Sequence, residues 1–314
     1  MKTLPKIALG AWAWGSGSVG GNQIFGHNLS ENDLKPIFDV AMSAGLNLWD
    51  TATVYGMGAS ENLLGNFAKT VKREDIILST KFTPQIAEMY EDSVEAMLNA
   101  SLARLNVEFI DIYWIHNPAD IEKWTPKLVP LVKSGKIKSI GVSNHSLAEL
   151  KRADAILRES GCKVDAVQNH FSLLNRSSET SGLLHYCREN GLNFFAYMVL
   201  EQGALSGKYN VKNTFPAGSA RANTYNPILP QLEDLIAAMK EIGAVHNLNV
   251  AQTSIAWAIN KGTLPIIGVT KVHHVEDALK VIDVKLSADE IQLLEKFADK
   301  ANISTIREWE KKME

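Results

Sequence analysis

Four ionisable side chains stand near the ends of three successive apolar segments, and their types suit the protonation of a carbonyl group. They are Asp50 and Tyr55 in WDTATVY, Lys81 in LSTK and His116 in IYWIHNP. A tyrosine hydroxyl is a poor acid at neutral pH until a nearby cation favours its phenolate, and Lys81 would supply that charge. Asp50 would hold and balance the buried ammonium. His116 would orient the carbonyl by donating a hydrogen bond to its oxygen, so the set predicts a site that polarises and protonates a carbonyl.

Eight short apolar segments are predicted to be the strands that position these residues. The segments are continuous rather than alternating in polarity, as in strands that are buried on both faces. They are residues 6–12, 46–52, 75–81, 109–117, 137–144, 165–171, 192–200 and 263–269. Strand and helix patterns alternate eight times, which predicts an α/β fold, a single-domain (β/α)8 TIM barrel over residues 1–314. An open doubly wound sheet is the alternative. In a barrel, the four ionisable residues would meet at the C-terminal ends of the strands, where barrel enzymes carry their chemistry.

The segments between the strands carry helix signals. Ser30 with Asp33 predicts the start of a helix, and Gly45 predicts its end. Residues 92–105 have apolar side chains at the spacing of one buried helix face. These side chains are Val94, Met97, Leu98, Leu102 and Leu105.

The stretch GSGSVG, residues 15–20, has the G-x-G-x-x-G spacing of a dinucleotide-binding turn. In such a turn the third glycine opens a helix whose N-terminal amides hold the pyrophosphate. Here the glycines lead into GNQIFGHNL, which lacks helical periodicity. The acidic residue about 20 positions further on is Asp39, inside a predicted helix rather than at the end of a strand. GSGSVG is therefore predicted to be a flexible loop at the barrel mouth and not the cofactor site.

Charge and composition exclude several kinds of partner. The formal net charge is −3 and the pI is near 6.3, which gives no electrostatic footprint for nucleic acid or an anionic membrane. No apolar run approaches the roughly 20 residues of a membrane helix, and the N-terminus has no signal-peptide pattern. The two cysteines, Cys162 and Cys187, have no metal-ligand spacing. A reduced cytoplasmic setting without a bound metal is expected.

Several motifs, in order along nearly the whole chain, resemble those of the aldo-keto reductases. They are WDTATVYGMGASENLLG, LSTKF, DIYWIHNP, IGVSN, VQNHFSLLN, the FAY and LEQGALSGKY segment, and IIGVTK. The resemblance implies a (β/α)8 barrel that carries NADPH in an extended pose. It also implies that the Asp, Tyr, Lys and His set serves a hydride transfer, with Tyr55 as the proton donor.

The resemblance further implies which residues bind the cofactor. Ser143, Asn144 and Gln168 resemble the residues that hydrogen-bond the nicotinamide carboxamide. Tyr197 resembles the aromatic residue that stacks beneath the nicotinamide ring. The loop along the pyrophosphate is implied at Leu200, Gln202, Gly203, Leu205 and Gly207, and the adenosine end at Gly268, Thr270, Lys271, His274 and Asp277.

The sequence departs from the family pattern at three places. His274 stands where the family commonly has Arg or Gln, Ala278 stands where Asn is common, and Met198 with Val199 replaces Ser-Pro. These departures predict weaker binding of the adenosine end of the cofactor and an altered loop after Tyr197. NADPH remains the expected cofactor, because Lys271 stands where the family commonly binds the 2′-phosphate.

Trp12, Trp14 and Trp114 are predicted to wall an apolar, partly aromatic substrate pocket. No arginine cluster appears in the nearby loops, so the expected substrate is a small neutral aldehyde or ketone rather than a polyanion. The leading hypothesis is an NADPH-dependent oxidoreductase that reduces this carbonyl to an alcohol. Two alternatives stay open, a cofactor-binding regulatory subunit of the same family and a Schiff-base aldolase that uses Lys81. The sequence indicates no oligomeric state.

Overall fold

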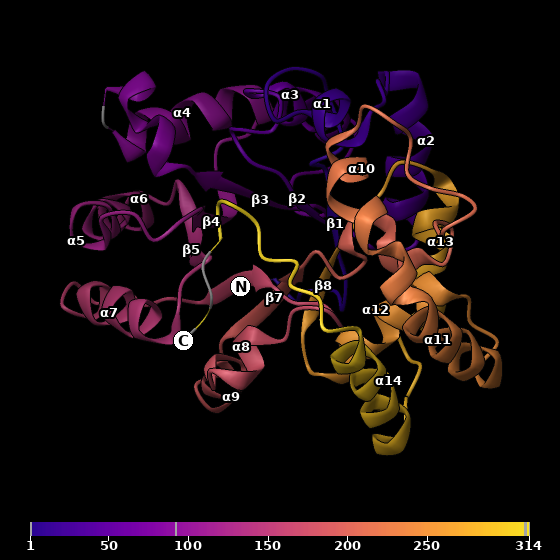
Figure 1. The fold of residues 1–314 in the computed structure, drawn as a ribbon. Coiled ribbons are helices and arrows are strands. Elements are labelled where there is room, and N and C mark those ends of the chain that lie inside the picture. The colour runs from indigo at the N-terminus through magenta and orange to yellow at the C-terminus, as the bar shows by residue number, and fades with distance from the viewer. Residues whose placement is uncertain (1, 92, 311–312, 314) are drawn as a thin grey trace.

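Eight parallel strands form a closed barrel in the computed structural model, which describes residues 2–91, 93–310 and 313. The strands are β1 (Ala8–Gly10), β2 (Leu48–Asp50), β3 (Ile77–Phe82), β4 (Ile110–Ile115), β5 (Ile137–Ser143), β6 (Ala166–His170), β7 (Asn193–Tyr197) and β8 (Leu264–Gly268). They pair in chain order, and β8 pairs with β1, where Ile267 lies opposite Leu9, to close the ring (Figure 1). Each strand overlaps one of the eight predicted segments, so the predicted (β/α)8 barrel is confirmed.

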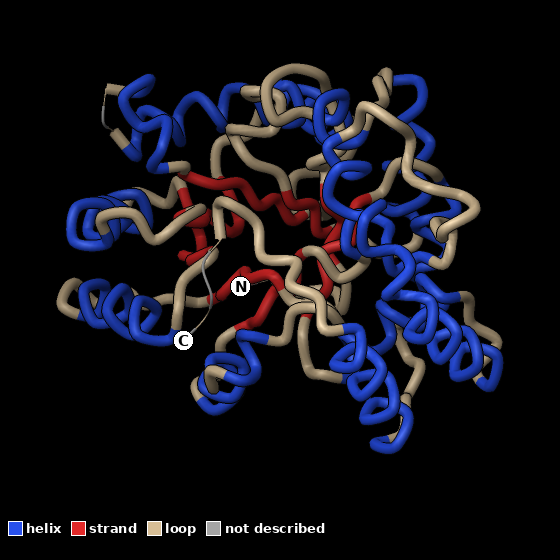
Figure 2. Tube along the Cα trace, viewed as in Figure 1, coloured by secondary structure: helices blue, strands red, loops and turns tan. Residues whose placement is uncertain are grey.

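Helices surround the barrel on the outside (Figure 2). The α-helices are α1 (Gly21–Phe25), α2 (Glu31–Ser43), α3 (Ala59–Ala68), α4 (Val94–Leu105), α5 (Ile121–Trp124), α6 (Val129–Lys133), α7 (Leu147–Arg158), α8 (Ser177–Thr180), α9 (Leu183–Glu189), α10 (Ala220–Tyr225), α11 (Glu233–Val245), α12 (Val250–Asn260), α13 (Val272–Val281) and α14 (Ala288–Ala301). Short 3-10 helices are η1 (Pro84–Tyr90), η2 (Thr125–Leu128), η3 (Glu201–Ser206) and η4 (Asn226–Leu232).

The ends of these helices follow the predicted signals. Ser30 caps α2, because its Oγ accepts a hydrogen bond from the Asp33 N–H while the Asp33 carboxylate accepts one from the Ser30 N–H. Gly45 follows α2 with a φ of 81°, a left-handed conformation that glycine adopts without steric cost. On α4, four of the five predicted apolar side chains are buried, while Leu102 is half-buried and Ser101 lies on the buried face.

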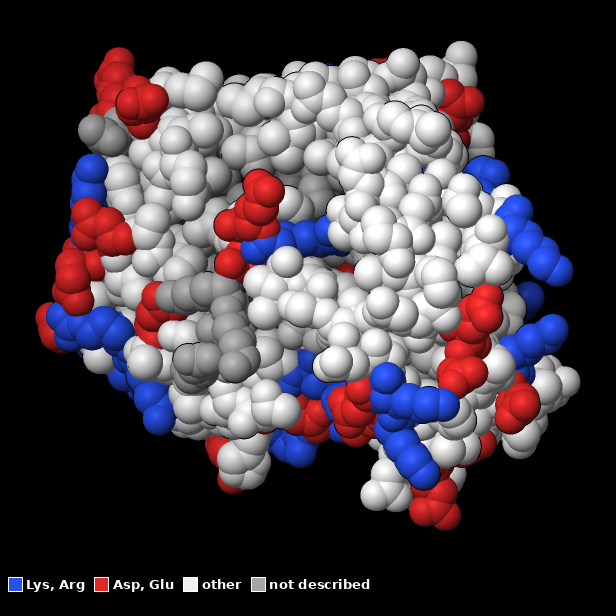
Figure 3. Space-filling view, viewed as in Figure 1, with Lys and Arg blue, Asp and Glu red and all other residues white. Residues whose placement is uncertain are grey.

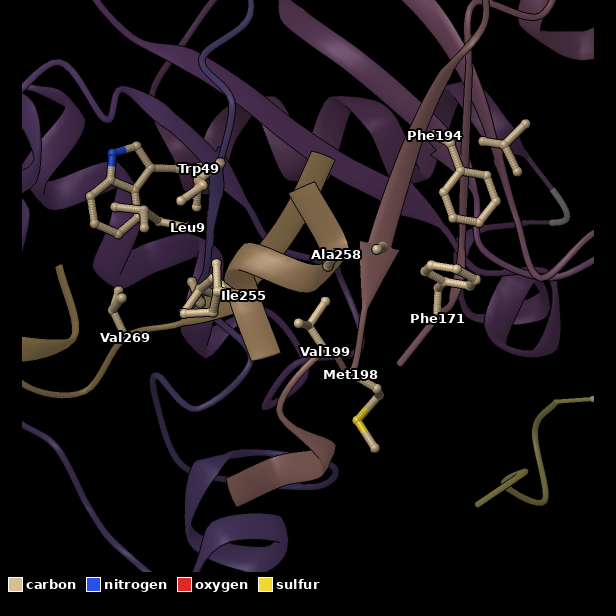
Figure 4. Close-up of a cluster of buried hydrophobic side chains, with 14 of the residues drawn as sticks. Leu9, Trp49, Phe171, Phe194, Met198, Val199, Ile255, Ala258 and Val269 are labelled. Carbon is tan, nitrogen blue, oxygen red and sulfur yellow. The ribbon is translucent and has the colours of Figure 1, made fainter. Parts of the chain in front are cut away.

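Two layers of apolar side chains hold the barrel together. The larger layer lies between the strands and the helices. Figure 4 shows part of it, with Leu9 and Trp49 from the strands and Ile255 from α12. The smaller layer fills the barrel interior and contains Trp114 and Phe195, whose ring centroids lie 5.1 Å apart. The interior is therefore a packed core, as in other parallel barrels.

Trp114 and Trp14 belong to these cores, and the prediction that they wall a substrate pocket is wrong. Trp114 is fully buried in the inner layer, and Gly141 on the neighbouring strand makes room for it, since a Cβ there would lie 2.0 Å from the indole. Trp14 is fully buried in the outer layer. Its Nε1 donates to the Val269 carbonyl at 2.8 Å, and its ring packs against Trp49.

The GSGSVG stretch lies at the barrel mouth, as predicted, but it runs into a helix that the sequence pattern does not indicate. Gly20 is the N-cap of α1, which has five residues. The next element is helix α2, which contains Asp39, so the arrangement is not a dinucleotide turn between two strands. Gly17 has a φ of 123°, and a Cβ on it would lie 3.2 Å from the Gly56 carbonyl oxygen. The glycines therefore allow this loop to pack against the turn that carries Tyr55.

The chain after α14 crosses the face of the barrel on which the strands end. In Figure 1 this segment, residues 302–310, is the yellow trace that runs from α14 across the front of the molecule. Figure 3, viewed from the same side, shows that charged side chains lie mostly at the rim of this face, with a small acidic and basic group near its centre. None of the helices within the described residues has the length and apolar character needed to cross a membrane.

Candidate active site

A cavity of about 1260 Å³ opens at the C-terminal ends of the strands. Its walls come from the loops that follow the strands and from the C-terminal segment. The predicted residues that line it are Trp12, Asp50, Tyr55, His116, Ser143, Asn144, Gln168, Tyr197, Leu200, Gln202, Gly203, Gly207, Gly268, Thr270, Lys271, His274 and Asp277. Lys81 and Leu205 are fully buried and do not line it. The fold thus brings most of the predicted site residues together around one space.

Lys81 and Asp50 form a buried ion pair beneath this cavity. The Lys81 Nζ donates to Asp50 Oδ2 at 2.6 Å, to the Thr51 carbonyl oxygen at 2.7 Å and to the Tyr55 hydroxyl at 3.4 Å. The two side chains are 0% and 4% exposed. Burial by itself lowers the pKa of Lys81, but the charge of Asp50 and the contact with Tyr55 outweigh it, and the net effect is a raised pKa.

This geometry disfavours the Schiff-base aldolase. A lysine that attacks a carbonyl must be neutral and must reach the substrate. Lys81 is held in its charged form, is fully buried, and has an acceptor for each of its three ammonium hydrogens. The other Asp50 oxygen, Oδ1, accepts from the Ser79 hydroxyl at 2.5 Å and from Gln168 Nε2 at 3.1 Å, which fixes the carboxylate in place.

Tyr55 lines the cavity and keeps its proton at neutral pH. Burial raises the pKa of Tyr55, and Lys81 acts in the opposite direction without overcoming burial. The net direction is therefore opposite to the sequence-based expectation that Lys81 makes this phenol more acidic than usual. What Lys81 does here is to donate to the hydroxyl oxygen, which leaves the Tyr55 hydrogen for an acceptor in the cavity.

His116 lies next to Tyr55, with ring centroids 6.1 Å apart, and is neutral. Burial and then the charge of Lys81 hold the pKa of His116 well below its usual range. Its Nδ1 lies 2.9 Å from the Thr83 hydroxyl. When Thr83 donates to Nδ1, the ring hydrogen is on Nε2, where it can be donated to a carbonyl oxygen.

The residues implied for the nicotinamide end lie at the C-terminal ends of β5, β6 and β7, with Asn144 directly after β5. They are hydrogen-bonded to His116 and Asp50. Asn144 has a φ of 61°, and its Oδ1 accepts from the Tyr197 hydroxyl at 2.5 Å. Its Nδ2 donates to the His116 carbonyl oxygen at 2.9 Å. Gln168 reaches Asp50, and Ser143 is almost fully buried beside Asn144. Asn144 thus connects Tyr197 to the strand end that carries His116, and Gln168 connects β6 to Asp50.

The loop after β7 has an unusual backbone. Met198, Glu201 and Gln202 have φ values of 61°, 46° and 52°, in a region where residues other than glycine are strained. Leu200, Gln202, Gly203 and Gly207 line the cavity, whereas Leu205 is a core residue that anchors the loop. Side-chain contacts of the buried Glu201 keep this strained loop in place.

Glu201 belongs to a buried charge cluster that the sequence pattern does not reveal. His170 lies between two carboxylates, with Nε2 at 2.7 Å from Glu201 Oε1 and Nδ1 at 2.9 Å from Glu310 Oε2. Burial opposes a charged imidazole, but the two carboxylates outweigh it and raise the pKa of His170 to about 9. Tyr225 and Thr305 also donate to Glu201. The cluster joins β6, the loop after β7 and the C-terminal segment.

The implied adenosine end lies after β8. Burial, and next the neighbouring His273, lower the pKa of His274 to about 4, although Asp277 acts in the opposite direction. The Nδ1 of His274 accepts from the Thr270 N–H at 3.2 Å, so the neutral ring presents Nε2–H as its donor. Lys271 lines the cavity here, and so does Lys208, to which the family resemblance assigns no role.

Arg221 is a second cationic residue of the cavity that the sequence motifs do not single out. Its Nη1 donates to the Gln202 carbonyl at 3.1 Å and its Nη2 to the Phe25 carbonyl at 2.9 Å, so it bridges the loops after β7 and β1. Its Nε is buried without a hydrogen-bond partner among the described residues. An arginine in a ligand cavity with an unused donor suits a phosphate group. A single arginine in the long segment between η3 and α11 is the only sequence signal for it.

The C-terminal segment also contributes to the cavity. Trp309 lines it and packs edge-on against Trp12, with ring centroids 6.1 Å apart. Trp12 in turn stacks on Tyr55 at 5.7 Å. Trp12 is therefore the one of the three predicted substrate-pocket tryptophans that lines the cavity. Nothing in the sequence around Trp309 indicates that it folds back over the barrel.

A family model and several known proteins match nearly the whole chain. A sequence model described as the aldo/keto reductase family matches residues 6–299. A chloroplastic pyridoxal reductase of Arabidopsis thaliana is 32% identical, over 97% of this chain and 86% of its own length. An aldo-keto reductase of Schizosaccharomyces pombe, whose name specifies NADP(+), is 31% identical, over 93% of this chain and 89% of its own.

Two solved structures of aldo-keto reductases superimpose on nearly the whole chain. A thermostable aldo-keto reductase crystallised with the inhibitor epalrestat superimposes with a TM-score of 0.76 at 26% identity, covering 94% of this chain and 95% of the other. An aldo-keto reductase from Klebsiella pneumoniae in complex with NADPH superimposes with a TM-score of 0.71 at 25% identity, covering 93% and 90%.

Proposed function

Because this chain belongs to the aldo/keto reductase family, we propose that it is an NADPH-dependent oxidoreductase that reduces aldehydes or ketones to alcohols, with Tyr55 as the proton donor. The observation that carries the proposal is the contact between Lys81 and Tyr55, backed by Asp50. It keeps a cation at the oxygen of a protonated phenol that lines a ligand cavity. The Klebsiella relative crystallised with NADPH supports the choice of cofactor.

NADPH fits the residues present in the cavity. Its phosphates need cations, and the cavity supplies Lys208, Arg221 and Lys271, of which Arg221 has a buried donor without a partner among the described residues. Ser143, Asn144 and Gln168 would hold the carboxamide, and Tyr197 would support the ring. When bound, NADPH supplies the hydride that reduces the carbonyl carbon.

The chain's own residues supply the proton and the orientation. His116 donates from Nε2 to the carbonyl oxygen and holds it near Tyr55. The Tyr55 hydroxyl gives its proton to that oxygen as negative charge develops there. Lys81 stabilises the phenolate that remains, and Asp50 keeps the ammonium in position. Because His116 is neutral over the physiological pH range, it acts as a hydrogen-bond donor and not as the acid.

The proposal is tested with a panel of aromatic and aliphatic aldehydes and ketones, followed by the loss of NADPH absorbance. Pyridoxal belongs in the panel because the Arabidopsis relative is named a pyridoxal reductase. Tyr55→Phe is expected to lower the rate by about 10²–10⁴-fold, since it removes only the general acid. NADPH binding, measured by protein fluorescence quenching, should persist. Near-normal turnover by this variant, with Tyr186→Phe on the outer helix α9 as the control, would rule out Tyr55 as the proton donor.

The cofactor assignment is tested at Lys271. Lys271→Ala is expected to weaken NADPH binding by about tenfold, because a charge-assisted contact with the 2′-phosphate is lost. NADH lacks this phosphate, so its affinity should stay the same. Fluorescence titrations with both nucleotides check this, and Lys280→Ala in the last turn of the same helix α13 is the matched control. Equal losses for both nucleotides would place the 2′-phosphate elsewhere.

A further inference from the structure

The C-terminal segment is held over the barrel by buried side chains and not by regular secondary structure. Thr305 donates to Glu201 at 2.9 Å, and Arg307 donates to the Tyr225 hydroxyl. The Glu310 side chain is 2% exposed although it lies in a loop. A carboxylate buried to this degree is costly unless it is paired and hydrogen-bonded, so its partners determine where the segment lies.

Glu310 uses both of its carboxylate oxygens for docking. Its Oε1 lies 2.7 Å from the Tyr197 hydroxyl oxygen and shares the single hydrogen of that hydroxyl with Asn144 Oδ1. Its Oε2 lies 2.9 Å from His170 Nδ1 and accepts from the Arg307 N–H at 3.0 Å. His170 and Tyr197 are both on the rigid barrel, at the ends of β6 and β7. Glu310 is therefore the point at which the segment is fastened to the residue proposed to support the nicotinamide.

Trp309, the preceding residue, depends on this fastening. Its side chain is 49% exposed, which is high for a residue that lines a cavity. Its ring meets Trp12 at an interplanar angle of 89°, and Trp12 meets Phe25 at 85° with centroids 5.4 Å apart. The three rings form one continuous aromatic wall, and Trp12 carries this wall to Tyr55.

We propose that Glu310 is a positioning residue that docks the C-terminal segment on Tyr197 and His170, and that Trp309 thereby completes an aromatic wall selecting flat aromatic carbonyl compounds over small aliphatic ones. The proposal rests on the proposed reductase function and names a substrate class for it. An aromatic substrate gains edge-to-face and stacking contacts with such a wall, which a short aliphatic aldehyde cannot make. The cavity lining also includes the polar side chains of His116, Asn117 and Gln85, which would accommodate the carbonyl end.

The test compares benzaldehyde with propanal in steady-state reduction by NADPH. Glu310→Ala and Trp309→Ala are both expected to lower kcat/KM for benzaldehyde by roughly tenfold, mainly through KM, because aromatic contact is lost. Values for propanal should stay within about twofold. NADPH affinity should also hold, because Tyr197 keeps its bond to Asn144. Glu310→Gln retains an acceptor for Tyr197 and should recover part of the preference for benzaldehyde.

Glu308→Gln removes the same charge from an exposed position on the same segment and is the matched control for docking. Because Glu308 lines the cavity, Ser304→Ala, which is exposed on the same segment and outside the cavity lining, is the control for the ratio of the two substrates. An unchanged benzaldehyde-to-propanal ratio in Glu310→Ala, or an equal loss for both substrates, would overturn the proposal. If the wild type reduces neither aldehyde, the proposed function fails on its own. Docking is then judged separately by hydrogen exchange of the peptide that contains Arg307, whose N–H bonds to Glu310. Exchange must be faster in Glu310→Ala than in Glu308→Gln, and equal rates would refute the docking.

Discussion

Lys81 donates all three of its ammonium hydrogens inside the barrel, so its removal affects two properties at once. In Lys81→Met the Tyr55 hydroxyl loses its cation, and activity should fall nearly as far as in Tyr55→Phe. Asp50 would remain as a buried carboxylate without a partner, which costs about 3–5 kcal/mol of unfolding free energy. Urea unfolding and the carbonyl assay measure the two effects.

The double variant Asp50→Asn with Lys81→Met separates these effects. It removes both charges, so much of the stability should return while the activity stays low. An active Lys81→Met enzyme with unchanged stability would contradict the ion pair described here.

The sequence predicts the chemistry of individual residues better than the direction of their side chains. Asp50, Tyr55 and His116 could be placed at one site because parallel strands end at the same face of a barrel. Trp114 could not be placed, since both faces of a buried strand are apolar and show no alternation. Trp14 could not be placed either, because it lies in the loop after β1 and its direction depends on a single contact with the Val269 carbonyl. The raised pKa of Tyr55 was equally inaccessible, because it depends on burial and not on the neighbouring charge alone.

At the scale of elements, the loop that contains GSGSVG supports the turn that carries Tyr55. Gly17→Ala would place a methyl group 3.2 Å from the Gly56 carbonyl oxygen and would strain a backbone with a φ of 123°. Displacing a catalytic group by about 1 Å can cost up to about 10²-fold in rate. We therefore expect a lower kcat with unchanged NADPH affinity, measured by the carbonyl assay and by fluorescence titration.

Gly45→Ala is the control for this prediction. Gly45 has a φ of 81°, so alanine is strained there as well, but the added Cβ meets nothing within 4 Å. A loss of cofactor binding in Gly17→Ala would instead revive the dinucleotide-turn interpretation of GSGSVG.

Helices and strands could be predicted where a pattern of apolar residues or a helix cap marks them. Segments that single side-chain contacts hold in place could not be predicted. The eight strands carry long apolar runs, and α2 and α4 carry caps and a buried face. Helix α1 has only five residues and no periodic pattern of apolar side chains, so its formation depends on contacts with the neighbouring loops at the barrel mouth. Residues 302–310 have no periodic pattern either, and their position depends on Glu310 and Thr305 reaching buried partners on the barrel.

For the whole molecule, two buried histidines make the folding stability depend on pH in opposite directions. His170 has a folded pKa of about 9 against an ordinary value of 6.5, so its contribution is fully present below pH 6.5 and is lost as the pH rises to about 9. His274 has a folded pKa of about 4, so the unfolded chain takes up more protons and stability falls as the pH drops from 6.5 towards 4. We expect the melting temperature to peak near pH 6.5, measured by thermal unfolding across this range.

Single variants assign the two limbs of this profile. His274→Asn should flatten the acid limb, and His170→Gln should flatten the alkaline limb and lower the maximum, because Glu201 and Glu310 lose their common partner. A profile that keeps both limbs in both variants would show that other groups control the stability.

The packed interior of the barrel also determines the route by which ligands bind and are released. Trp114, Phe195 and their neighbours fill the space inside the strands, so among the described residues the strand ends are open towards the mouth and not through the barrel. Ser143 and Gln168, proposed for the cofactor, are 1% and 3% exposed, whereas Trp309 at the proposed substrate wall is 49% exposed. In the proposed arrangement the cofactor lies deeper than the carbonyl compound, so it has to bind first and be released last. We therefore expect a compulsory order in which NADPH precedes the carbonyl compound and the alcohol leaves before NADP+, a sequence that product-inhibition kinetics can establish.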